Sequence, residues 1–484
     1  MTPWSETEVV VTGLDGGVGA LVAKQLLLRG VKKVWLHHPT LEDVIDESHL
    51  ETSCGILRAN DLGDGVASAF ARRLRGYGVC ETLGVSDHLD VNTVPRNALV
   101  CVCDGSGELA NAAGLGEQCR NTKRAFAFVK ARGLTGTVFV DSGTPDAVTL
   151  YQALRPQNTY MTGGAAENTT DSFADTQRTD ALHAAFLLSN PETRWLLAKK
   201  DKNVHDVHAL IGATLTGHSP GPFAALVAEI ACEGIGDMLR MGRVAPDDRP
   251  DEVDDKKTAS QWTHVDALDV LDSGAAASAP VPKSETCWYE PIPCSGNEET
   301  SASASGDNES GGRISRPTLR TLIGHLVMSK LAKGKVLLAG VGTPGGGAAL
   351  EALCALGVGE IVLVDDESVS SGVDTGVDPN DTGIREHPIL RLADPGDLAC
   401  VSVARVCARV AANAFPDVRV ETCLVENMGR FFFANENQEN RLIAAVDASS
   451  GHRAAFRETG SCKLVRATGA AAAMELALLA KGLE

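Results

Sequence analysis

The sequence predicts an α/β protein made of two doubly wound domains, related as a repeat, with a helical insertion between them. The stretch "VTGLDGGVGALVAKQLLLRGVKKVWLHHP" begins at Val11, and "LLAGVGTPGGGAALEALCALGVGEIVLVDDE" follows about three hundred residues later. Both read as an apolar strand, a glycine-rich turn, a helix and a second strand, the order that opens a Rossmann-like parallel sheet. A repeat of this length indicates a duplicated domain.

The composition fits this architecture and excludes some partners. Hydrophobic residues make up 44% of the 484 positions and aromatic residues only 4%, so the cores must consist largely of Ala, Val and Leu. The net charge of −19 argues against nucleic acid and anionic membranes as partners. We find no apolar run long enough to span a bilayer.

The 13 cysteines include no CxxC pair, which argues against a structural zinc site. The closest two, Cys101 and Cys103, fall in an expected strand, and we expect their side chains to point to opposite faces. Unpaired cysteines without a secretion signal predict a cytoplasmic or nuclear protein.

The order of segments divides the chain into four parts. Residues 1–178 form the first α/β half, since strand-like and helix-like segments alternate there. Residues 179–242 read as helical and predict a bundle. Residues 243–316 combine acidic, Ser-rich stretches with the short apolar island "TCWYEPIP" and predict a linker. The α/β pattern returns over residues 317–484.

The second glycine loop predicts a nucleotide site. Gly340, Gly342 and Gly345 form GxGxxG, in which the glycines permit a tight turn, close approach of a phosphate and helix–strand packing. The strand "EIVLVDDE" then supplies Asp365 and Glu367, where an acid would hold a ribose hydroxyl. A merely structural turn is the alternative interpretation.

The first loop has a different pattern. Thr12, Gly13, Gly17 and Gly19 make TGxxxGxG, which is typical of short-chain dehydrogenases. That family needs Tyr-x-x-x-Lys, and none of the four tyrosines has a lysine four residues later. The second strand also ends in "WLHHP", without an acid. We therefore expect this loop to have kept its shape and lost its ligand.

Six segments, taken in order, resemble one known family. They are "GVGALVAKQLLLRGVKKVWLHHP", "VKARGLTGTVFVDSG", "LHAAFLLSN", "SPGPFAALVAEIACEGI", "CWYEPIP" and "GHLVMSKLAKGKVLLAGVG". Together they are similar to the E1 ubiquitin-activating enzymes, whose inactive and active adenylation halves are of the ThiF/MoeB type and enclose a four-helix bundle. The resemblance extends from about Glu8 to Gly469.

The resemblance implies an activity. In this family the active half binds ATP and Mg²⁺ and joins the C-terminal glycine of ubiquitin, or of a ubiquitin-like protein, to AMP. A cysteine on a separate domain then takes the acyl group and passes it to a conjugating enzyme. By the resemblance, the three glycines cradle phosphate, Asp365 and Glu367 are the two acids after the strand, and Asp447 in "LIAAVDASS" faces Mg²⁺. Asp447 also reads as a helix cap or turn residue.

The cations of the family's ATP site do not match. The Asn-Arg-Gln segment corresponds to "SGVDTGVDPND", which has no Arg, Lys or Gln. The lysine expected at the start of the next helix falls near Ser402–Val403. Arg385, Arg391 and Arg405 are candidate replacements. The start "MTPWSETEVVV" is too short for the helix that carries a further arginine in the family.

The thioester domain and the C-terminal ubiquitin-fold domain also have no counterpart here, and no cysteine is assigned as the thioester nucleophile. Cys462 falls near a cysteine of the active half and reads as a structural thiol.

Three functions follow from these observations. The first is an E1-type protein that adenylates ubiquitin or a ubiquitin-like protein and relies on a second E1-like subunit or a conjugating enzyme. The second is a pseudoenzyme of the same family that acts as a binding or regulatory subunit; the missing cations favour it, and the three acids count against it. The third is an unrelated dinucleotide-dependent oxidoreductase, which the absent Tyr-x-x-x-Lys pair disfavours.

Overall fold

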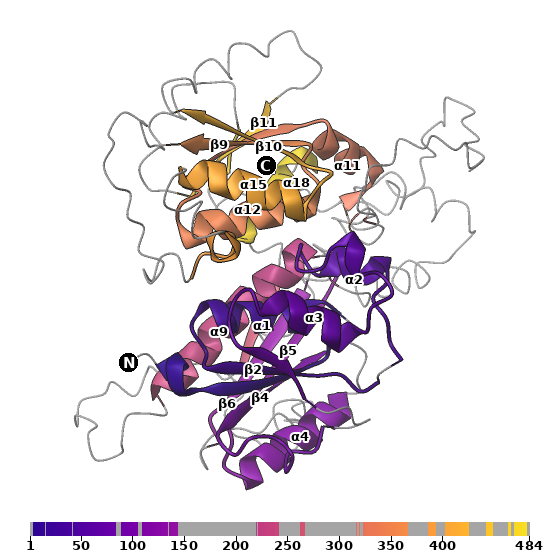
Figure 1. The fold of residues 1–484 in the computed structure, drawn as a ribbon, viewed down its shortest axis with the longest axis vertical. Helices are drawn as coiled ribbons and strands as arrows, with labels where there is room; N and C mark the ends of the chain where they lie inside the picture. The colour runs from indigo at the N-terminus through magenta and orange to yellow at the C-terminus, as the bar shows by residue number, and fades with distance from the viewer. Residues whose placement is uncertain are drawn as a thin grey trace, which may run out of the picture.

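The computed structural model contains two β-sheets flanked by helices, one sheet in each half of the chain (Figure 1). This confirms the predicted fold class. The described residues are 3–14, 16–40, 42–83, 89–104, 109–133, 135–143, 219, 221–241, 262–266, 316, 319, 323–365, 386–393, 402–424, 442–448, 463–465 and 469–481.

The first sheet has seven strands in the order β3-β2-β1-β4-β5-β6-β7. The strands from β3 to β5 are parallel, while β6 and β7 pair antiparallel at one edge. Val9, Val10 and Val11 are fully buried in β1, as in strands covered on both faces. The strands are β1 (Glu8–Thr12), β2 (Lys33–His37), β3 (Cys80–Thr82), β4 (Ala98–Asp104), β5 (Phe126–Arg132), β6 (Thr135–Asp141) and β7 (Trp262–Asp266).

Helices cover both faces of this sheet, which makes it doubly wound (Figure 1). α4 covers one face over a cluster that includes Phe126 and Phe128, and α1, α3 and α9 cover the other. The described helices of the first half are α1 (Val18–Leu28), α2 (Glu47–Thr52), α3 (Val66–Leu74), α4 (Leu109–Asn121), α9 (Gly221–Met241) and the 3-10 turns η1 (Pro3–Glu6) and η2 (Ala59–Asp61).

The second sheet has five strands, all parallel, in the order β10-β9-β8-β11-β12. The strands are β8 (Lys335–Ala339), β9 (Glu360–Asp365), β10 (Arg419–Leu424), β11 (Leu442–Asp447) and β12 (Lys463–Val465). Its described helices are α11 (His325–Ala332), α12 (Pro344–Leu356), α15 (Val403–Ala414), α18 (Ala471–Lys481) and the 3-10 turn η8 (Leu390–Leu392).

Both halves repeat one strand–loop–helix–strand unit without a gap. A glycine with positive φ follows the first strand of each unit, Gly13 at 83° and Gly340 at 78°. Seventeen residues later a second positive-φ glycine ends the helix, Gly30 at 84° and Gly357 at 86°. L residues other than glycine rarely adopt this conformation, so the positive φ explains why glycine occupies these positions. The predicted duplication therefore holds residue by residue over this unit.

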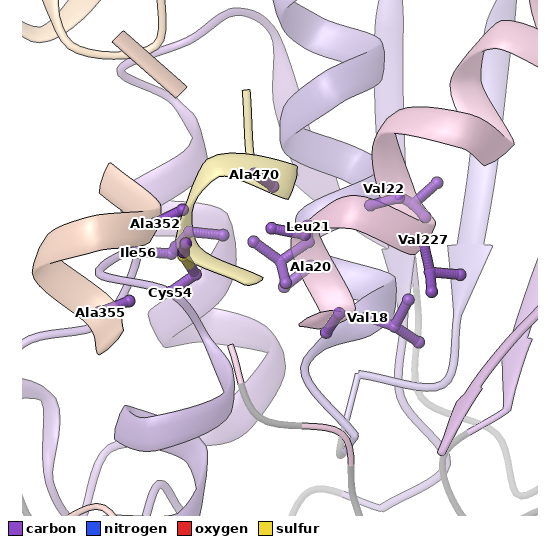
Figure 2. Packing of buried hydrophobic residues seen from close by; sticks show 14 of the residues in the cluster. Val18, Ala20, Leu21, Val22, Cys54, Ile56, Val227, Ala352, Ala355 and Ala470 are labelled. Atoms are coloured by element: carbon purple, nitrogen blue, oxygen red, sulfur yellow. The ribbon is translucent and has the colours of Figure 1, made fainter. Parts of the chain in front are cut away.

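One hydrophobic core continues from the first half into the second. Cys54 and Ile56, which follow α2, lie beside Ala352 and Ala355 of α12 (Figure 2). Polar contacts cross the same boundary, since the Leu319 amide donates to a carboxylate oxygen of Glu51 over 2.7 Å. The first half therefore packs against α12 and contacts Leu319 of the second half.

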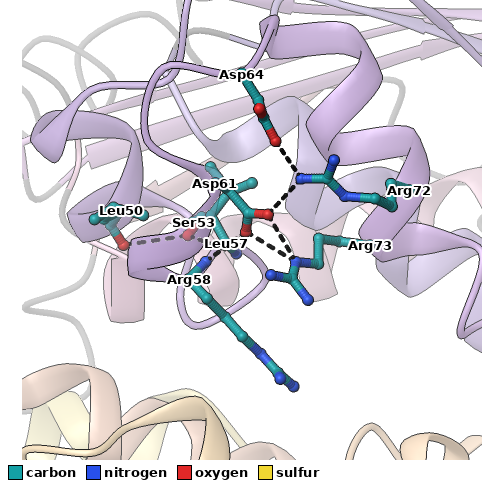
Figure 3. A network of polar contacts seen from close by, with 8 residues as sticks. All are labelled: Leu50, Ser53, Leu57, Arg58, Asp61, Asp64, Arg72 and Arg73. Carbon is teal, nitrogen blue, oxygen red and sulfur yellow. Dashed lines mark hydrogen bonds and ion pairs between the residues drawn. The ribbon is translucent and has the colours of Figure 1, made fainter.

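A polar network fixes the loop before α3 (Figure 3). The carboxylate of Asp61 is fully buried and accepts hydrogen bonds from Arg72 Nη2 at 2.6 Å, Arg73 Nε at 2.8 Å and the Arg58 amide at 2.7 Å. Burial opposes ionisation of Asp61, but the bonds from Arg73, Arg58 and Arg72 hold its pKa below the usual value. The network therefore ties η2 to α3.

The structure differs from the sequence predictions in two places, at residues 262–266 and at Cys101 and Cys103, and it describes only part of a third prediction, the helical bundle. Residues 262–266 lie within the predicted linker, yet they form β7 and pair antiparallel with β6. Of the predicted helical bundle, the structure describes only α9 and Ser219; α9 packs on α1 and on the first sheet. The expectation for Cys101 and Cys103 was wrong, because alternate residues of a strand share a face; their sulfur atoms lie 3.8 Å apart.

Among the described helices, none has the length and apolar character needed to cross a bilayer.

Candidate functional site

The second glycine loop joins β8 to the amino end of α12. Gly340 turns the chain with its positive φ. Thr343 caps the helix, since its hydroxyl accepts a hydrogen bond from the Gly346 amide at 3.0 Å and donates to the Gly340 carbonyl at 2.9 Å. Pro344 occupies the first helical turn, where no amide hydrogen is needed. The remaining amides at this helix end form the positive end of the helix dipole, which suits a phosphate.

The structural roles of the glycines in this loop differ from the predicted ones. Gly342 is exposed, so a ligand can approach its backbone closely. Close packing falls to Gly346 rather than to Gly345, because a Cβ on Gly346 would collide with the Gly340 carbonyl oxygen. The Gly345 carbonyl accepts a hydrogen bond from the Gly469 amide at 3.2 Å, which joins the loop to the start of α18.

His387, which the sequence reasoning missed, supports the loop from behind. A Cβ on Gly347 would strike its imidazole ring, so the ring packs directly on α12. Its Nδ1 accepts from the Ile389 and Leu390 amides at 3.2 and 3.1 Å, and Nε2 donates to the Val341 carbonyl at 2.7 Å. Burial lowers the pKa of His387 to about 4, so the ring is neutral and structural. The run Gly345–Gly347 was the sequence signal for such close packing.

Two of the three predicted acids end strands on either side of β8. Asp365 is the last residue of β9, and Asp447 the last of β11. Asp447 pairs with Ala339, the residue before Gly340, and its side chain is buried. The carboxyl ends of β9, β8 and β11 therefore meet at the glycine loop, the edge where open α/β sheets bind ligands. The third acid, Glu367, lies outside the described residues.

The predicted cation position is next to the loop but carries no charge. A Cβ on Gly342 would lie 3.5 Å from Cγ1 of Val403, the first residue of α15. Among the candidate replacements, Arg405 is exposed on the same helix and Arg391 lies in η8, the turn that His387 anchors. Arg385 lies outside the described residues. Oxygen and nitrogen ligands do not gather into a metal cluster in the described ranges, so the Mg²⁺ role of Asp447 stays a prediction.

The first loop repeats the same geometry with its helix end covered. A Cβ on Gly19 would lie 2.5 Å from the Gly13 carbonyl oxygen, the counterpart of the Gly346–Gly340 contact. A Cβ on Gly17, the residue that caps α1, would lie 2.6 Å from the Thr52 carbonyl oxygen. The end of α2 therefore occupies the place where a phosphate would approach. This supports the expectation that the loop has lost its ligand.

At the end of β2, the first half has two histidines, His37 and His38, at the place where the second half has Asp365 at the end of β9. His37 ends β2, and its Nδ1 lies 3.1 Å from the Thr12 hydroxyl. His38 is the positional equivalent of Asp365, since both lie twenty-five residues after the first loop glycine. It is buried with Nε2 3.0 Å from the Asp43 carboxylate. The first loop thus offers no acid to a ribose at this strand end.

These features define a duplicated, Rossmann-like α/β protein in which the second glycine loop is exposed at Gly342. Sequence comparison then points to one family. Over 165 residues, 34% of this chain, the sequence is 29% identical to ubiquitin-activating enzyme E1 1 of Arabidopsis thaliana. Over 146 residues, 30% of the chain, it is 32% identical to ubiquitin-activating enzyme E1 2 of Triticum aestivum. The resemblance to E1 enzymes is confirmed, although the matches span only 15% and 13% of those two proteins.

Solved structures offer a more distant likeness. E. coli MccB with MccA-N7isoASN aligns over 50% of this chain and 58% of its own, with 12% identity and a TM-score of 0.33. PaaA aligns over 50% of this chain and 66% of its own, with 12% identity and a TM-score of 0.32. Scores this low support no functional argument. No protein-family model matches the chain.

Proposed function

We propose that the chain is an E1-type adenylation protein that activates the C-terminal glycine of ubiquitin or a ubiquitin-like protein. One observation carries the proposal: β9, β8 and β11 bring Asp365, Gly340 and Asp447 to one edge, at the amino end of α12. The similarity to E1 enzymes supports the same activity.

The residues present suit ATP and Mg²⁺ in part. The exposed Gly342 and the helix N-terminus fit phosphate groups, and the carboxylates of Asp365 and Asp447 are the oxygen ligands that Mg²⁺ prefers. Bound ATP would supply the adenylyl group, with pyrophosphate as the leaving group. The chain's own part is to hold the phosphates at the loop and to orient the modifier's carboxylate toward them. Glu367, two residues beyond β9, is the further acid assigned to this site.

ATP–pyrophosphate exchange on the purified chain, with ubiquitin and a panel of ubiquitin-like proteins, tests this proposal. We expect modifier-dependent exchange that Asp447→Asn abolishes, because the substitution removes the charge and keeps the side chain's shape. Asp237→Asn, at an exposed position near the end of α9, is the matched control and should leave exchange unchanged. Absence of exchange with every modifier would reject the enzymatic function.

A second candidate, a pseudoenzyme that binds a ubiquitin-like protein or an E1-like subunit, is favoured by Val403. The apolar residue stands beside Gly342 where the family resemblance expects a lysine. Calorimetry separates the two functions: saturable binding of ATP supports the enzyme, whereas binding of a modifier without ATP binding supports the pseudoenzyme. We place either protein in the cytoplasm or nucleus, since the described cysteines are buried free thiols.

A further inference from the structure

A cavity of about 490 Å³ opens at the amino-terminal edge of the first sheet, at the opposite end of β1 from the first glycine loop. Its walls come from the residues that lead into β1, β4 and β5 and from the end of α9. Met238 and Leu239 supply an apolar wall. The volume falls within the range of small-molecule sites.

Arg124 is a buried cation in the wall of this cavity. The residue is 7% exposed, and its Nη1 donates to the carbonyl oxygens of Val94 at 3.0 Å and Pro95 at 2.7 Å. Its Nε is buried and has no hydrogen-bond partner among the described residues. No carboxylate in the described part of the chain forms an ion pair with it. A buried charge without a counter-charge is costly, so an anion at this place would stabilise it.

Lys123, beside it, is held in an unusual backbone conformation. Its φ of 55° is in the left-handed region, at the position after the α4 cap that glycine usually occupies. The Lys123 amide donates to the Arg120 carbonyl at 2.9 Å, and the Arg124 amide to the Cys119 carbonyl at 2.8 Å, which closes the helix as a Schellman motif. Strain of this kind often marks functional positions. A lysine here places a third cation in the wall, with Arg124 and Arg96.

The charge of the wall differs from that of the whole chain. Three cations line the cavity against one acid, Glu6, although the chain carries a net charge of −19. Asp141, the residue before the lining Ser142, is engaged by Arg120, with Nη2 and Oδ2 2.7 Å apart. A cluster of cations beside an apolar wall is suited to a ligand that carries oxyanions.

We propose that this basic cavity, formed by Arg96, Lys123 and Arg124, binds a small molecule through its phosphate or carboxylate groups. Arg124 supplies a fixed, buried guanidinium, and Arg96 and Lys123 supply exposed charges at the mouth. Met238 and Leu239 cover an apolar part of the ligand. The site belongs to the first half, so it does not depend on the proposed function of the second loop.

Lys123→Gly tests the proposal because it should raise the unfolding temperature and weaken anion binding at the same time. Glycine adopts the left-handed conformation without strain, so we expect a higher unfolding temperature. The same change removes a cation from the wall, so calorimetry with citrate and with inorganic phosphate should show about ten-fold weaker binding. A purely structural Lys123 would give the higher unfolding temperature with unchanged affinity, which would overturn the proposal.

Three more variants, one of them a control, locate the bound anion. Arg96→Gln should weaken binding in the same way, because Arg96 is exposed and its loss leaves the core intact. Lys333→Gln, at an exposed position after α11, is the matched control and should bind like the parent. Thr343→Ala tests the second glycine loop. Loss of binding in Thr343→Ala alone would place the anion at that loop and reject the basic cavity. The absence of saturable binding at millimolar citrate and phosphate would also reject the basic cavity. A preference between the two anions distinguishes carboxylate from phosphate ligands.

Discussion

Lys24 of α1 and Glu351 of α12 occupy equivalent positions in the two halves and form an ion pair with each other. Each lies eleven residues after the first glycine of its loop, Gly13 or Gly340. Lys24 Nζ is 2.6 and 2.5 Å from the two carboxylate oxygens, and its side chain is 3% exposed. Because these two equivalent residues contact each other, they lie near the approximate twofold axis that relates the two halves. Two copies of the second half would bring Glu351 against Glu351, so the charges favour pairing of unlike halves.

Reversal of the Lys24 charge should therefore weaken the contact between the halves and lower the free energy of unfolding. Burial alone lowers the pKa of Lys24, but the Glu351 carboxylate more than offsets this and raises it above the usual value, so Lys24 is charged at neutral pH. We expect Lys24→Glu to cost about 3–5 kcal/mol, since it places a buried acid against the partly buried carboxylate of Glu351. The double variant Lys24→Glu/Glu351→Lys should recover most of this loss. Urea unfolding followed by tryptophan fluorescence measures both.

Lys32→Glu is the control for this prediction. Lys32 pairs with Glu8 at 2.8 Å, but its side chain is 58% exposed. Exposed ion pairs contribute about 1 kcal/mol or less, so this variant should unfold almost like the parent. A double variant no more stable than Lys24→Glu alone would show that the charges do not direct the pairing of the halves.

Glu229 should make stability depend on pH near neutrality. Both carboxylate oxygens lie 3.4 Å from the Ala470 amide at the start of α18. Burial is the main cause that raises the pKa of Glu229 to about 7; Glu233 and Glu351 add to it, while Ala470 and Arg29 oppose it. The protonated form is thus favoured in the folded state. Its contribution to stability is complete below the unfolded pKa of about 4.3 and is lost as pH rises through 7.

Glu229→Gln removes this titration. We expect the variant to show a smaller fall in the free energy of unfolding between about pH 5 and pH 8, and to be more stable than the parent at pH 8. Urea unfolding at several pH values gives the comparison. A variant that keeps the slope of the parent would assign the pH dependence to other groups.

The helix glycines of the second loop should tolerate no side chain. We expect Gly346→Ala to cost about 1–3 kcal/mol, because its methyl group would meet the Gly340 carbonyl oxygen and push α12 away from β8. Gly114 of α4 has open space around it, so Gly114→Ala should instead stabilise by about 0.5–1 kcal/mol. Thermal unfolding measures the expected loss of stability in Gly346→Ala and the expected gain in Gly114→Ala. A neutral Gly346→Ala would mean that the loop packs less closely than the structure indicates.

Local features of the fold were predictable from sequence, and contacts between distant segments were not. Gly340, Asp365 and Asp447 follow from the local pattern, because each ends or follows an apolar strand. The ion pair of Lys24 and Glu351 joins helices more than three hundred residues apart, and no local pattern points to it. The same holds for His387, whose partner Gly347 lies forty residues earlier in the sequence.

The linker prediction was wrong at β7 because the sequence on both sides of this strand is polar. "WTHVD" stands between acidic and Ser-rich stretches, and a window average across them favours a linker. In the structure this segment pairs with β6 at the sheet edge. Edge strands bury less surface than central ones, so tertiary pairing outweighed composition here.

Val403 provides the sharpest test of what the second loop binds. Its Cγ1 would lie 3.5 Å from a Cβ on Gly342, so Val403→Lys would bring an ammonium group close to phosphates held there. With the dielectric screening of bulk water, one added charge about 4 Å from a phosphate oxygen gives roughly 1 kcal/mol, or about five-fold tighter ATP binding by calorimetry. Val403→Met adds length without charge and should bind ATP like the parent. The gain should shrink at high salt, since such charges are screened. Equal affinities for the two variants at low salt would place the phosphates of ATP away from this loop and would contradict the proposed site.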